Sequence, residues 1–313
     1  MIIPVYNSAD TLEPLVNRLL GTFRDQASEC EILMVNDGSQ DGSWNVIQSL
    51  ASRNSEVHGL NLMRNFGQHN ALLAGIRQAK GEVIVTMDDD LQNPPEEVPK
   101  LLEELAKGHA VVYGNPDQEQ HGMFRDNASL FVKIALRVGF GYKHASHTSS
   151  FRAFRAQLRD AFSGFDAKYV SIDVLLTWAT TDFSWVAVQH DERSTGTSGY
   201  TLRKLLSHTV NMLTSFSSLP LRISSFIGFA FMAFGILILF YALMVYLVDG
   251  QGVPGFTFLA SIIAIFSGVQ LFSLGIIGEY IGRIHQRALS QPCYVIAAET
   301  DTLLINDGED SHS

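Results

Sequence analysis

The chain has 313 residues, of which 46% are hydrophobic and 17% are charged, and its formal net charge is −10. The charged fraction is low for a purely soluble protein and indicates membrane content. The acidic balance and the lack of a long basic run argue against a nucleic-acid partner.

Two cysteines, Cys30 and Cys293, stand far apart in unlike contexts. They predict neither a disulfide framework nor a metal site, and they fit a reducing, cytosolic compartment. No signal peptide is expected, because "IIPVYN" follows Met1 without a basic start.

Strand-like and helix-like segments alternate through residue 115. Short apolar runs indicate strands, and apolar residues spaced by three and four positions indicate helices. Their order predicts an α/β fold with a doubly wound, mostly parallel sheet, in which ligands bind at the carboxyl ends of the strands. The expected strands are 2–5, 31–35, 58–63, 83–87 and 110–114, and the expected helices are 9–23, 43–53, 68–79 and 96–107.

Two acidic clusters, "VNDGSQDGS" and "MDDDLQ", each follow one of these strands and should meet at the same rim of the sheet. Along an extended segment alternate side chains point the same way, so Asp88 and Asp90 can converge while Asp89 faces elsewhere. Two hard oxygen donors suit Mg²⁺ or Mn²⁺ together with phosphate oxygens. The alternative is a solvated turn that caps the next helix. The local pattern leaves both open, and the position on the rim favours the metal.

Other residues near this rim are ambiguous taken one at a time. Asp37 could accept hydrogen bonds from a nucleobase or ribose, or form an ordinary Asx turn. In "RNFGQHNA", residues 64 to 71, Gly67 allows close backbone approach and the following helix start offers N–H groups to an anion. Arg64 could pair with a phosphate or make a structural ion pair, and a lone histidine such as His69 is more often structural.

The pattern is less regular from residue 115 to 200. Residues 123–139 look amphipathic, and residues 183–201 predict a strand followed by a Gly/Ser/Thr loop. Residues 200–222 predict interfacial helices on a bilayer surface, with an ordinary amphipathic surface helix as the alternative.

Two long apolar segments, 223–248 and 256–278, carry no formal charge. Each exceeds the ~20 residues needed to cross a hydrocarbon core, so two transmembrane helices are expected rather than two buried core helices. Their short connector has no Lys or Arg, whereas basic residues flank the pair on its outer sides, which places both termini in the cytoplasm. These flanking residues are Arg203, Lys204, Arg222, Arg283 and Arg287.

Several motifs occur in a fixed order along the chain: "IIPVYN", "VNDGSQDGS", "RNFGQHNALLAGI", "MDDDLQNPPEEVP", "DERSTGTSGYTLRKL", "SFSSLPLR" and "GEYIGRI". This succession resembles the family-2 (GT-A fold) glycosyltransferases that load a sugar onto a polyprenyl phosphate. Bactoprenol glucosyltransferases, dolichol-phosphate mannose synthases and undecaprenyl-phosphate aminoarabinose-type transferases belong to that group. The resemblance covers nearly the whole chain. It implies a GT-A domain over 1–199, juxtamembrane helices over 200–222, a transmembrane pair over 223–287 and a cytoplasmic tail over 288–313.

The resemblance also assigns roles to individual residues. Asp88 and Asp90 match the family's D-x-D metal pair for Mg²⁺ or Mn²⁺, and with Arg193 they would form the catalytic set. The implied nucleotide-binding residues are Pro4, Tyr6, Asn7, Asp37, Gly67, Gln68, Asp88 and Asp89. The implied residues for the lipid phosphate are Arg152, Arg203 and Lys204.

The implied reaction is an inverting transfer from a nucleotide-sugar to undecaprenyl or dolichyl phosphate, in cell-envelope polysaccharide synthesis. UDP is favoured only by family frequency. The implied location is the cytoplasmic face of a bacterial inner membrane, and a homo-oligomer such as a tetramer is compatible with the resemblance.

Two departures from the family pattern affect the acceptor side. Many relatives have an acidic residue immediately before "FR", where this chain has Ser149 and Ser150, and relatives have lysine where this chain has Gly199. They leave open a membrane-anchored nucleotide-binding scaffold that has lost turnover, or a transferase of the same fold with another acceptor.

A processive polysaccharide synthase is disfavoured, because its Q-x-x-R-W signature is absent: every tryptophan here follows Ser or Thr. A transporter is disfavoured because the two spans carry no intramembrane charge.

Overall fold

The computed structural model describes residues 1–25, 29–116, 148–165, 170–191, 219–249, 255–289 and 291–300. Its contacts divide the chain into two compact units. The first contains residues 1–201 together with 290–313, and the second contains residues 202–289. Each unit is described by itself below.

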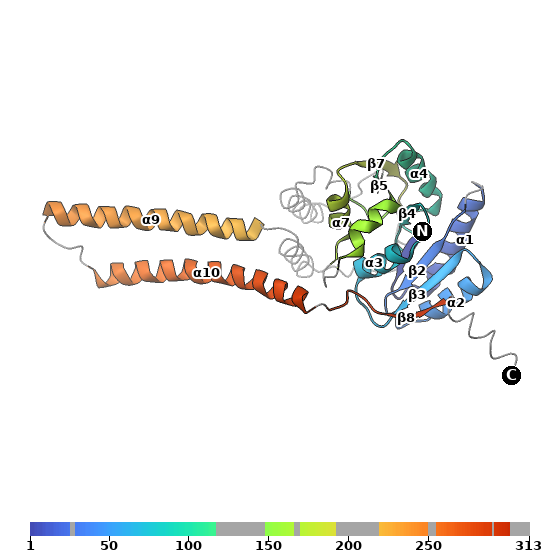
Figure 1. Cartoon of the computed structure of the whole chain (residues 1–313), viewed down its shortest axis with the longest axis horizontal. Coiled ribbons are helices and arrows are strands. Elements are labelled where there is room, and N and C mark those ends of the chain that lie inside the picture. The colour runs from blue at the N-terminus through green and yellow to red at the C-terminus, as the bar shows by residue number, and fades with distance from the viewer. Residues whose placement is uncertain are drawn as a thin grey trace. The chain divides into compact units, whose positions relative to one another are not determined.

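An eight-stranded sheet forms the centre of the first unit, in the order β7-β5-β6-β4-β1-β2-β3-β8 (Figure 1). Strands β1 to β4 are parallel neighbours in the order β4-β1-β2-β3, and β5 is parallel to β7. Strand β6 is antiparallel to both β4 and β5, and β8 is antiparallel to β3. The strands are β1 (Ile2–Val5), β2 (Ile32–Asn36), β3 (Val57–Leu62), β4 (Val83–Thr86), β5 (Val111–Pro116), β6 (Arg152–Arg155), β7 (Phe183–Val188) and β8 (Ile296–Glu299).

Helices cover both faces of this sheet, because successive strand residues point to opposite sides. Ile2 packs into one buried cluster and Ile3 into the other. Helices α3 (Gln68–Gln78), α6 (Asp160–Ser163) and α7 (Ile172–Ala179) contribute to the first cluster. Helices α1 (Ala9–Asp25), α2 (Ser43–Arg53) and α4 (Val98–Ala106) contribute to the second. Two short 3-10 helices, η1 (Pro95–Glu97) and η3 (Ala156–Arg159), precede α4 and α6.

The expected fold class, a mostly parallel α/β sheet followed by membrane-length helices, is confirmed. Each strand and helix expected before residue 115 is present, with small differences at the ends. The strand expected after residue 183 is β7, and β6 is an additional strand that the irregular pattern of this region did not predict.

Residues 288–313 were expected to form a C-terminal tail, but the structure has a strand, β8, within this segment. Strand β8 pairs with β3, with Leu60 opposite Glu299, and the Gly59 N–H donates to Thr300 Oγ1 at 3.0 Å. Without β8, the edge of β3 would expose unpaired backbone groups, which are a liability in any sheet. This segment therefore belongs to the first unit.

The second unit contains two long helices, α9 (Leu219–Asp249) and α10 (Phe256–Ala288). Residues Pro220–Val245 and Ile265–His285 are long and apolar enough to cross a membrane, and neither span is buried within the described protein. The expectation of two membrane-length helices is therefore met by length and composition. The amphipathic segment 123–139 lies outside the described residues. So does the interfacial segment up to residue 218, and its last four residues begin α9.

Candidate active site

A cavity of about 260 Å³ lies at the carboxyl ends of β1, β2 and β4. The structure brings both acidic clusters to it, although they are about 50 residues apart in sequence. Eight of the residues implicated by sequence line it, together with Val5 and Asn65, to which no role was assigned. The eight are Pro4, Tyr6, Asp37, Gly67, Gln68, Asp88, Asp89 and Asp90.

The Asp88 carboxylate is held on both oxygens by side chains from other elements. Gln68 Nε2, at the start of α3, donates to Asp88 Oδ1 at 2.6 Å. Ser150 Oγ, just before β6, donates to Asp88 Oδ2 at 2.6 Å. Hydrogen bonds to an ionised carboxylate are short and strong, so these two contacts fix its orientation.

Asp89 and Asp90 have different partners. The Tyr6 N–H donates to Asp89 Oδ2 at 3.3 Å, whereas Asp90 Oδ1 accepts the Gln92 N–H at 3.1 Å. Burial raises the pKa of Asp89 to about 6, against the opposing effect of hydrogen bonds from Ser8 and Tyr6. Asp89 thus contacts the residue after β1, while its neighbours contact α3, the residue Ser150 before β6, and their own loop.

Asp37 organises the loop that closes another side of the cavity. Its side chain is only 2% exposed, and its two oxygens accept the N–H groups of Phe66 (2.7 Å) and Gly67 (2.8 Å). Burial raises the Asp37 pKa, and these two bonds act in the opposite direction. The same loop passes so close to Gly38 that a Cβ there would lie 2.4 Å from the Arg64 carbonyl carbon. Any residue larger than glycine at position 38 would displace the loop.

Asn7 lies one step behind the cavity and is not among the described residues that line it. It has a positive φ of 54°, a conformation that asparagine tolerates better than most residues. Its N–H donates to Ser39 Oγ at 3.0 Å and its Oδ1 accepts the Gln40 N–H at 2.8 Å. Asn7 therefore joins the loop after β1 to the loop after β2.

Arg152 does not fit the acceptor role that the resemblance implied. Its side chain is 1% exposed, forms an ion pair with Asp173 of α7 and donates from Nε to Thr86 Oγ1 at 3.0 Å. Tyr113 Oη donates to the same Asp173 oxygen at 3.0 Å. The guanidinium is committed to a buried network and is closed to a lipid phosphate. Asp173 is 21 residues away from Arg152, and no local pattern identifies it as the partner.

The remaining predicted residues, Arg193, Arg203 and Lys204, lie outside the described residues. The last described residue before them is Asp191, whose N–H donates to the Gln92 carbonyl at 2.8 Å. Gln92 is also the residue that donates to Asp90. The described chain therefore stops beside the acidic loop.

The carboxylate oxygens at this cavity are of the type that binds a hard divalent cation. Within the described part of the chain, no group of three or more His, Cys, Asp or Glu side chains is placed to hold a metal by itself. A cation such as Mg²⁺ needs only one or two carboxylates when substrate phosphates and water supply the other oxygens. An ionised carboxylate offers about four lone-pair sites, so a carboxylate that accepts hydrogen bonds can also be a metal ligand.

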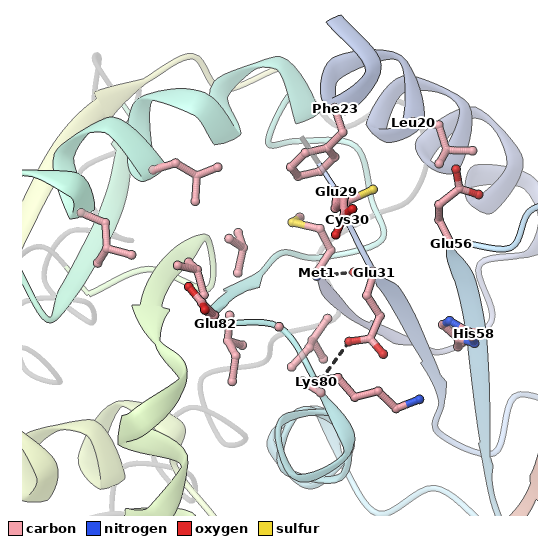
Figure 2. Close-up of a pocket in the computed structure, with 18 of the residues that line it drawn as sticks. Met1, Leu20, Phe23, Glu29, Cys30, Glu31, Glu56, His58, Lys80 and Glu82 are labelled. Atoms are coloured by element: carbon pink, nitrogen blue, oxygen red, sulfur yellow. Dashed lines mark hydrogen bonds between the residues drawn. The ribbon is translucent and has the colours of Figure 1, made fainter. Parts of the chain in front are cut away.

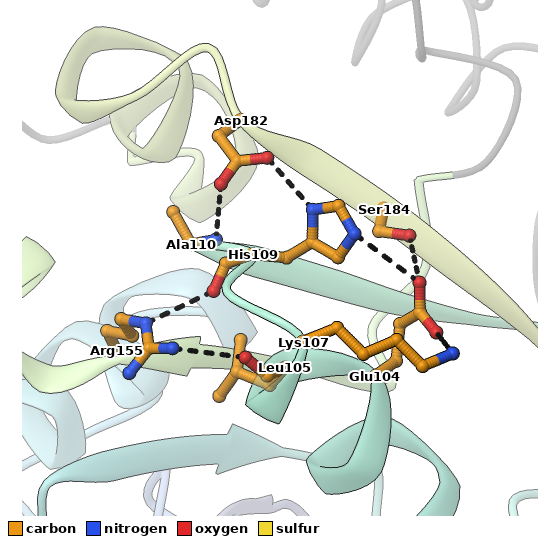
Figure 3. A network of polar contacts seen from close by, with 8 residues as sticks. All are labelled: Glu104, Leu105, Lys107, His109, Ala110, Arg155, Asp182 and Ser184. Atoms are coloured by element: carbon orange, nitrogen blue, oxygen red, sulfur yellow. Dashed lines mark hydrogen bonds and ion pairs between the residues drawn. The ribbon is translucent and has the colours of Figure 1, made fainter.

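Two further features, a cavity and a polar network, lie at the opposite, amino ends of the strands. A cavity of about 1220 Å³ is lined by Met1, Glu31, His58, Lys80 and Glu82 among others (Figure 2). A network around Glu104, His109 and Asp182 joins the end of α4 to β5 and β7 (Figure 3). Ligands of parallel α/β sheets bind at the carboxyl ends, so the smaller cavity is the better candidate despite its size.

Two family models match this chain. One, described as "Glycosyl transferase family 2", matches residues 1–163, and the other, described as "GtrB C-terminal hairpin", matches residues 219–284.

Curated relatives align over nearly the whole chain. An undecaprenyl-phosphate 4-deoxy-4-formamido-L-arabinose transferase of Pseudomonas fluorescens (strain SBW25) is 33% identical over 299 residues, covering 95% of this chain and 88% of its own. The transferase of the same description from Photorhabdus laumondii subsp. laumondii is 30% identical over 315 residues, covering 100% and 97%. Among solved structures, glucosyl-3-phosphoglycerate synthase from Mycobacterium tuberculosis with Mn²⁺ and UDP-glucose has a TM-score of 0.47 at 16% identity, covering 68% of this chain and 75% of its own.

Proposed function

The chain belongs to glycosyl transferase family 2, and on that premise we propose that it transfers a sugar from a nucleotide-sugar to a polyprenyl phosphate at the cytoplasmic membrane surface. The observation that carries the proposal is the cavity at the carboxyl ends of β1, β2 and β4, with its three adjacent carboxylates. The hairpin match over residues 219–284 and the two membrane-length helices support a membrane-bound acceptor.

The donor nucleotide is proposed to bind in this cavity. Tyr6 is half exposed, and Gly67 has a positive φ of 97° with open space where a Cβ would be. Both leave room for a flat base and a ribose beside Pro4, Asp37 and Gln68. We propose a UDP-sugar, and the descriptions of the curated relatives suggest 4-deoxy-4-formamido-L-arabinose as the sugar to test.

Asp88 and Asp90 are proposed to hold Mg²⁺ or Mn²⁺ against the diphosphate. When bound, the cation would neutralise the charge that develops on the departing nucleoside diphosphate. Arg193 is proposed to meet the same phosphates, since the described chain reaches Asp191 beside Gln92 and the acidic loop.

The acceptor oxygen attacks the anomeric carbon while the bond from that carbon to the diphosphate breaks, which inverts the configuration. A phosphate monoester has a second pKa of about 6 and is mostly dianionic at neutral pH. Such a nucleophile needs little help from a general base. The lack of a carboxylate at Ser150 is therefore compatible with turnover. Arg203 and Lys204 remain proposed contacts of the lipid phosphate. Arg152 is no longer proposed as a contact, because its side chain is buried and paired with Asp173.

The two helices are proposed to anchor the chain in the membrane that holds the lipid acceptor, with both termini in the cytoplasm. A tetramer is compatible with this arrangement and would be measured separately by mass.

The test is release of nucleoside diphosphate by the detergent-purified full chain. Mn²⁺ or Mg²⁺ is supplied with UDP-, GDP- and dTDP-sugars, including a UDP-4-formamido-pentose, with and without a short polyprenyl phosphate. Release that needs both one sugar nucleotide and the lipid supports the proposal. Nucleotide binding without release from any donor would favour the scaffold instead.

A further inference from the structure

Ser150 lies directly before β6 and contacts one of the carboxylates of the candidate active site. Its Oγ lies 2.6 Å from Asp88 Oδ2, opposite the bond from Gln68 to Oδ1. The two donors come from different elements, α3 and the approach to β6, so the carboxylate cannot rotate without breaking one of them.

The Ser150 main chain is in turn fixed from the protein interior. Thr86 Oγ1, at the end of β4, donates to the Ser150 carbonyl at 2.7 Å. Arg152 Nε donates to Thr86 Oγ1 at 3.0 Å, and these two residues are register partners in the β4–β6 pair. Both side chains are buried, with exposures of 0% for Thr86 and 1% for Arg152.

The far end of this chain of contacts is anchored on α7. Arg152 is paired with Asp173, which also accepts the Tyr113 hydroxyl. A buried guanidinium without its partner would be costly, so the pair has little freedom to move. The contacts run without a gap from α7 through Arg152, Thr86 and Ser150 to the edge of the cavity.

The chemistry of serine suits this position. Asp88, Asp89 and Asp90 already place three carboxylates in a row, and a carboxylate at position 150, within 2.6 Å of Asp88, would repel it. A hydroxyl instead adds no charge and donates a hydrogen bond to the Asp88 carboxylate at 2.6 Å.

We infer that Ser150 is a positioning residue for the Asp88 carboxylate, and that Thr86 and Arg152 fix Ser150 in place. The inference rests on the proposed function, because it takes Asp88 to be a ligand of the divalent cation. Ser150 would then belong to the donor site, where its hydroxyl orients a proposed ligand of the cation.

The test is Mn²⁺-dependent UDP binding by the full chain in detergent, with Mn²⁺ affinity measured independently by electron paramagnetic resonance. Ser150→Ala should weaken Mn²⁺ affinity in the presence of UDP by about tenfold or more, as loss of an outer-shell partner typically does. Ser150→Thr, which keeps the hydroxyl, should restore most of it. The matched control is Ser149→Ala, since Ser149 Oγ accepts the Phe151 N–H at 3.2 Å, a contact that does not involve Asp88. Thermal unfolding of each variant checks that the fold is kept.

The outcomes separate this inference from the proposed function. Wild-type Mn²⁺ affinity in Ser150→Ala, together with its loss in Asp88→Asn, would overturn the positioning role alone. Wild-type affinity in Asp88→Asn would overturn the metal assignment and the inference with it. Equal losses in Ser150→Ala and Ser149→Ala would show a general disturbance of the loop and would also overturn the positioning role.

Discussion

Asp90 shares the rim with Asp88, but its described hydrogen bond is to the Gln92 N–H of its own loop. Asp90→Asn keeps the size of the side chain and removes its charge. We expect turnover to be lost and Mn²⁺-dependent UDP binding to weaken, because a neutral amide is a poor partner for a hard cation. Sugar transfer and UDP binding are measured with and without Mn²⁺. Asp160→Asn, on an exposed part of α6, is the matched control. Near-normal turnover in Asp90→Asn would remove Asp90 from the metal site.

Arg152 and Arg18 compare a buried ion pair with an exposed one. Arg152→Met leaves Asp173 without its cation in the interior, and we expect the free energy of unfolding to fall by about 3 kcal/mol. Arg18→Ala breaks an exposed pair with Glu96, where both side chains are more than a third exposed, and should cost less than about 1 kcal/mol. Thermal and chemical unfolding in one detergent give both values. Equal losses would mean that Arg152 is not structural and would reopen its acceptor role.

The acidic residues of the rim could be predicted because they follow strands, and the carboxyl ends of parallel strands meet. Roles for Pro4, Tyr6 and Gln68 came only from the family resemblance. Sequence reasoning did not reach the contacts that cross between elements. Ser150 and Asp88 are 62 residues apart. The sequence around Arg152 does not distinguish an arginine that binds a phosphate from one that pairs with Asp173. Position on a strand is local information, whereas the partner of a side chain depends on the packing of the whole sheet.

Strand β1 has only four residues, and its amino end lies beside the cavity of about 1220 Å³ that Met1 helps to line. Among the described residues, its register with β4 is the single pair Ile2–Thr86, although β4 starts at Val83. The Met1 amino group is buried there, donates to the Glu31 carbonyl at 2.6 Å, and has its pKa lowered by burial to about 6 (Figure 2).

We expect four alternating apolar residues added before Met1 to raise the unfolding temperature. They would continue β1 alongside β4 and move the amino group out of the interior, where its charge is unfavourable. Thermal unfolding is compared with that of a Gly-Ser extension of the same length. No gain over the Gly-Ser extension would show that this cavity does not accept a strand.

The network between α4, β5 and β7 predicts a pH dependence of stability. The hydrogen bond with His109 at 3.0 Å, helped by the Ala110 N–H at 2.9 Å, lowers the pKa of Asp182 below its ordinary value of 3.8 (Figure 3). Because the folded-state pKa is the lower one, this stabilisation is fully present above pH 3.8 and is lost as pH falls through the folded-state pKa.

Asp182→Asn should therefore lower the unfolding temperature at neutral pH, by a difference that shrinks in acid. The carboxylate is half exposed, so the effect is small. Unfolding temperatures are measured across the acid range, with Asp160→Asn as control. A difference that stays constant to pH ~2 would contradict the assignment.

Element types were predictable where the periodicity was clear, as in the strands and helices before residue 115. Two strands were not. Strand β6 reads "RAFR", with charges at both ends, and β8 lies in a segment that resembles a tail. Both are antiparallel additions whose pairing is set by partners far away in sequence, β4 and β3. The spacing of apolar residues within a short segment does not indicate which distant strand it pairs with.

At the scale of the whole molecule, the ordered motifs predicted the family and its GT-A fold class, and both are confirmed. They also predicted a C-terminal helical pair, which matches the hairpin model over residues 219–284. The bulk apolar content pointed to the membrane before any motif was considered. What composition and motifs could not give is the sugar, because its recognition depends on a few side chains in the least regular part of the sequence.

This family-2 enzyme is proposed to deliver its sugar to a lipid phosphate. The most direct measurement supplies labelled nucleotide-sugar to the purified full chain with Mn²⁺ and either a polyprenyl phosphate or the corresponding polyprenol. We expect label in the organic extract with the phosphate and none with the alcohol, because only the phosphate is already ionised at neutral pH. Equal transfer to the alcohol, or label found only in water-soluble product, would show that the acceptor is not a lipid phosphate.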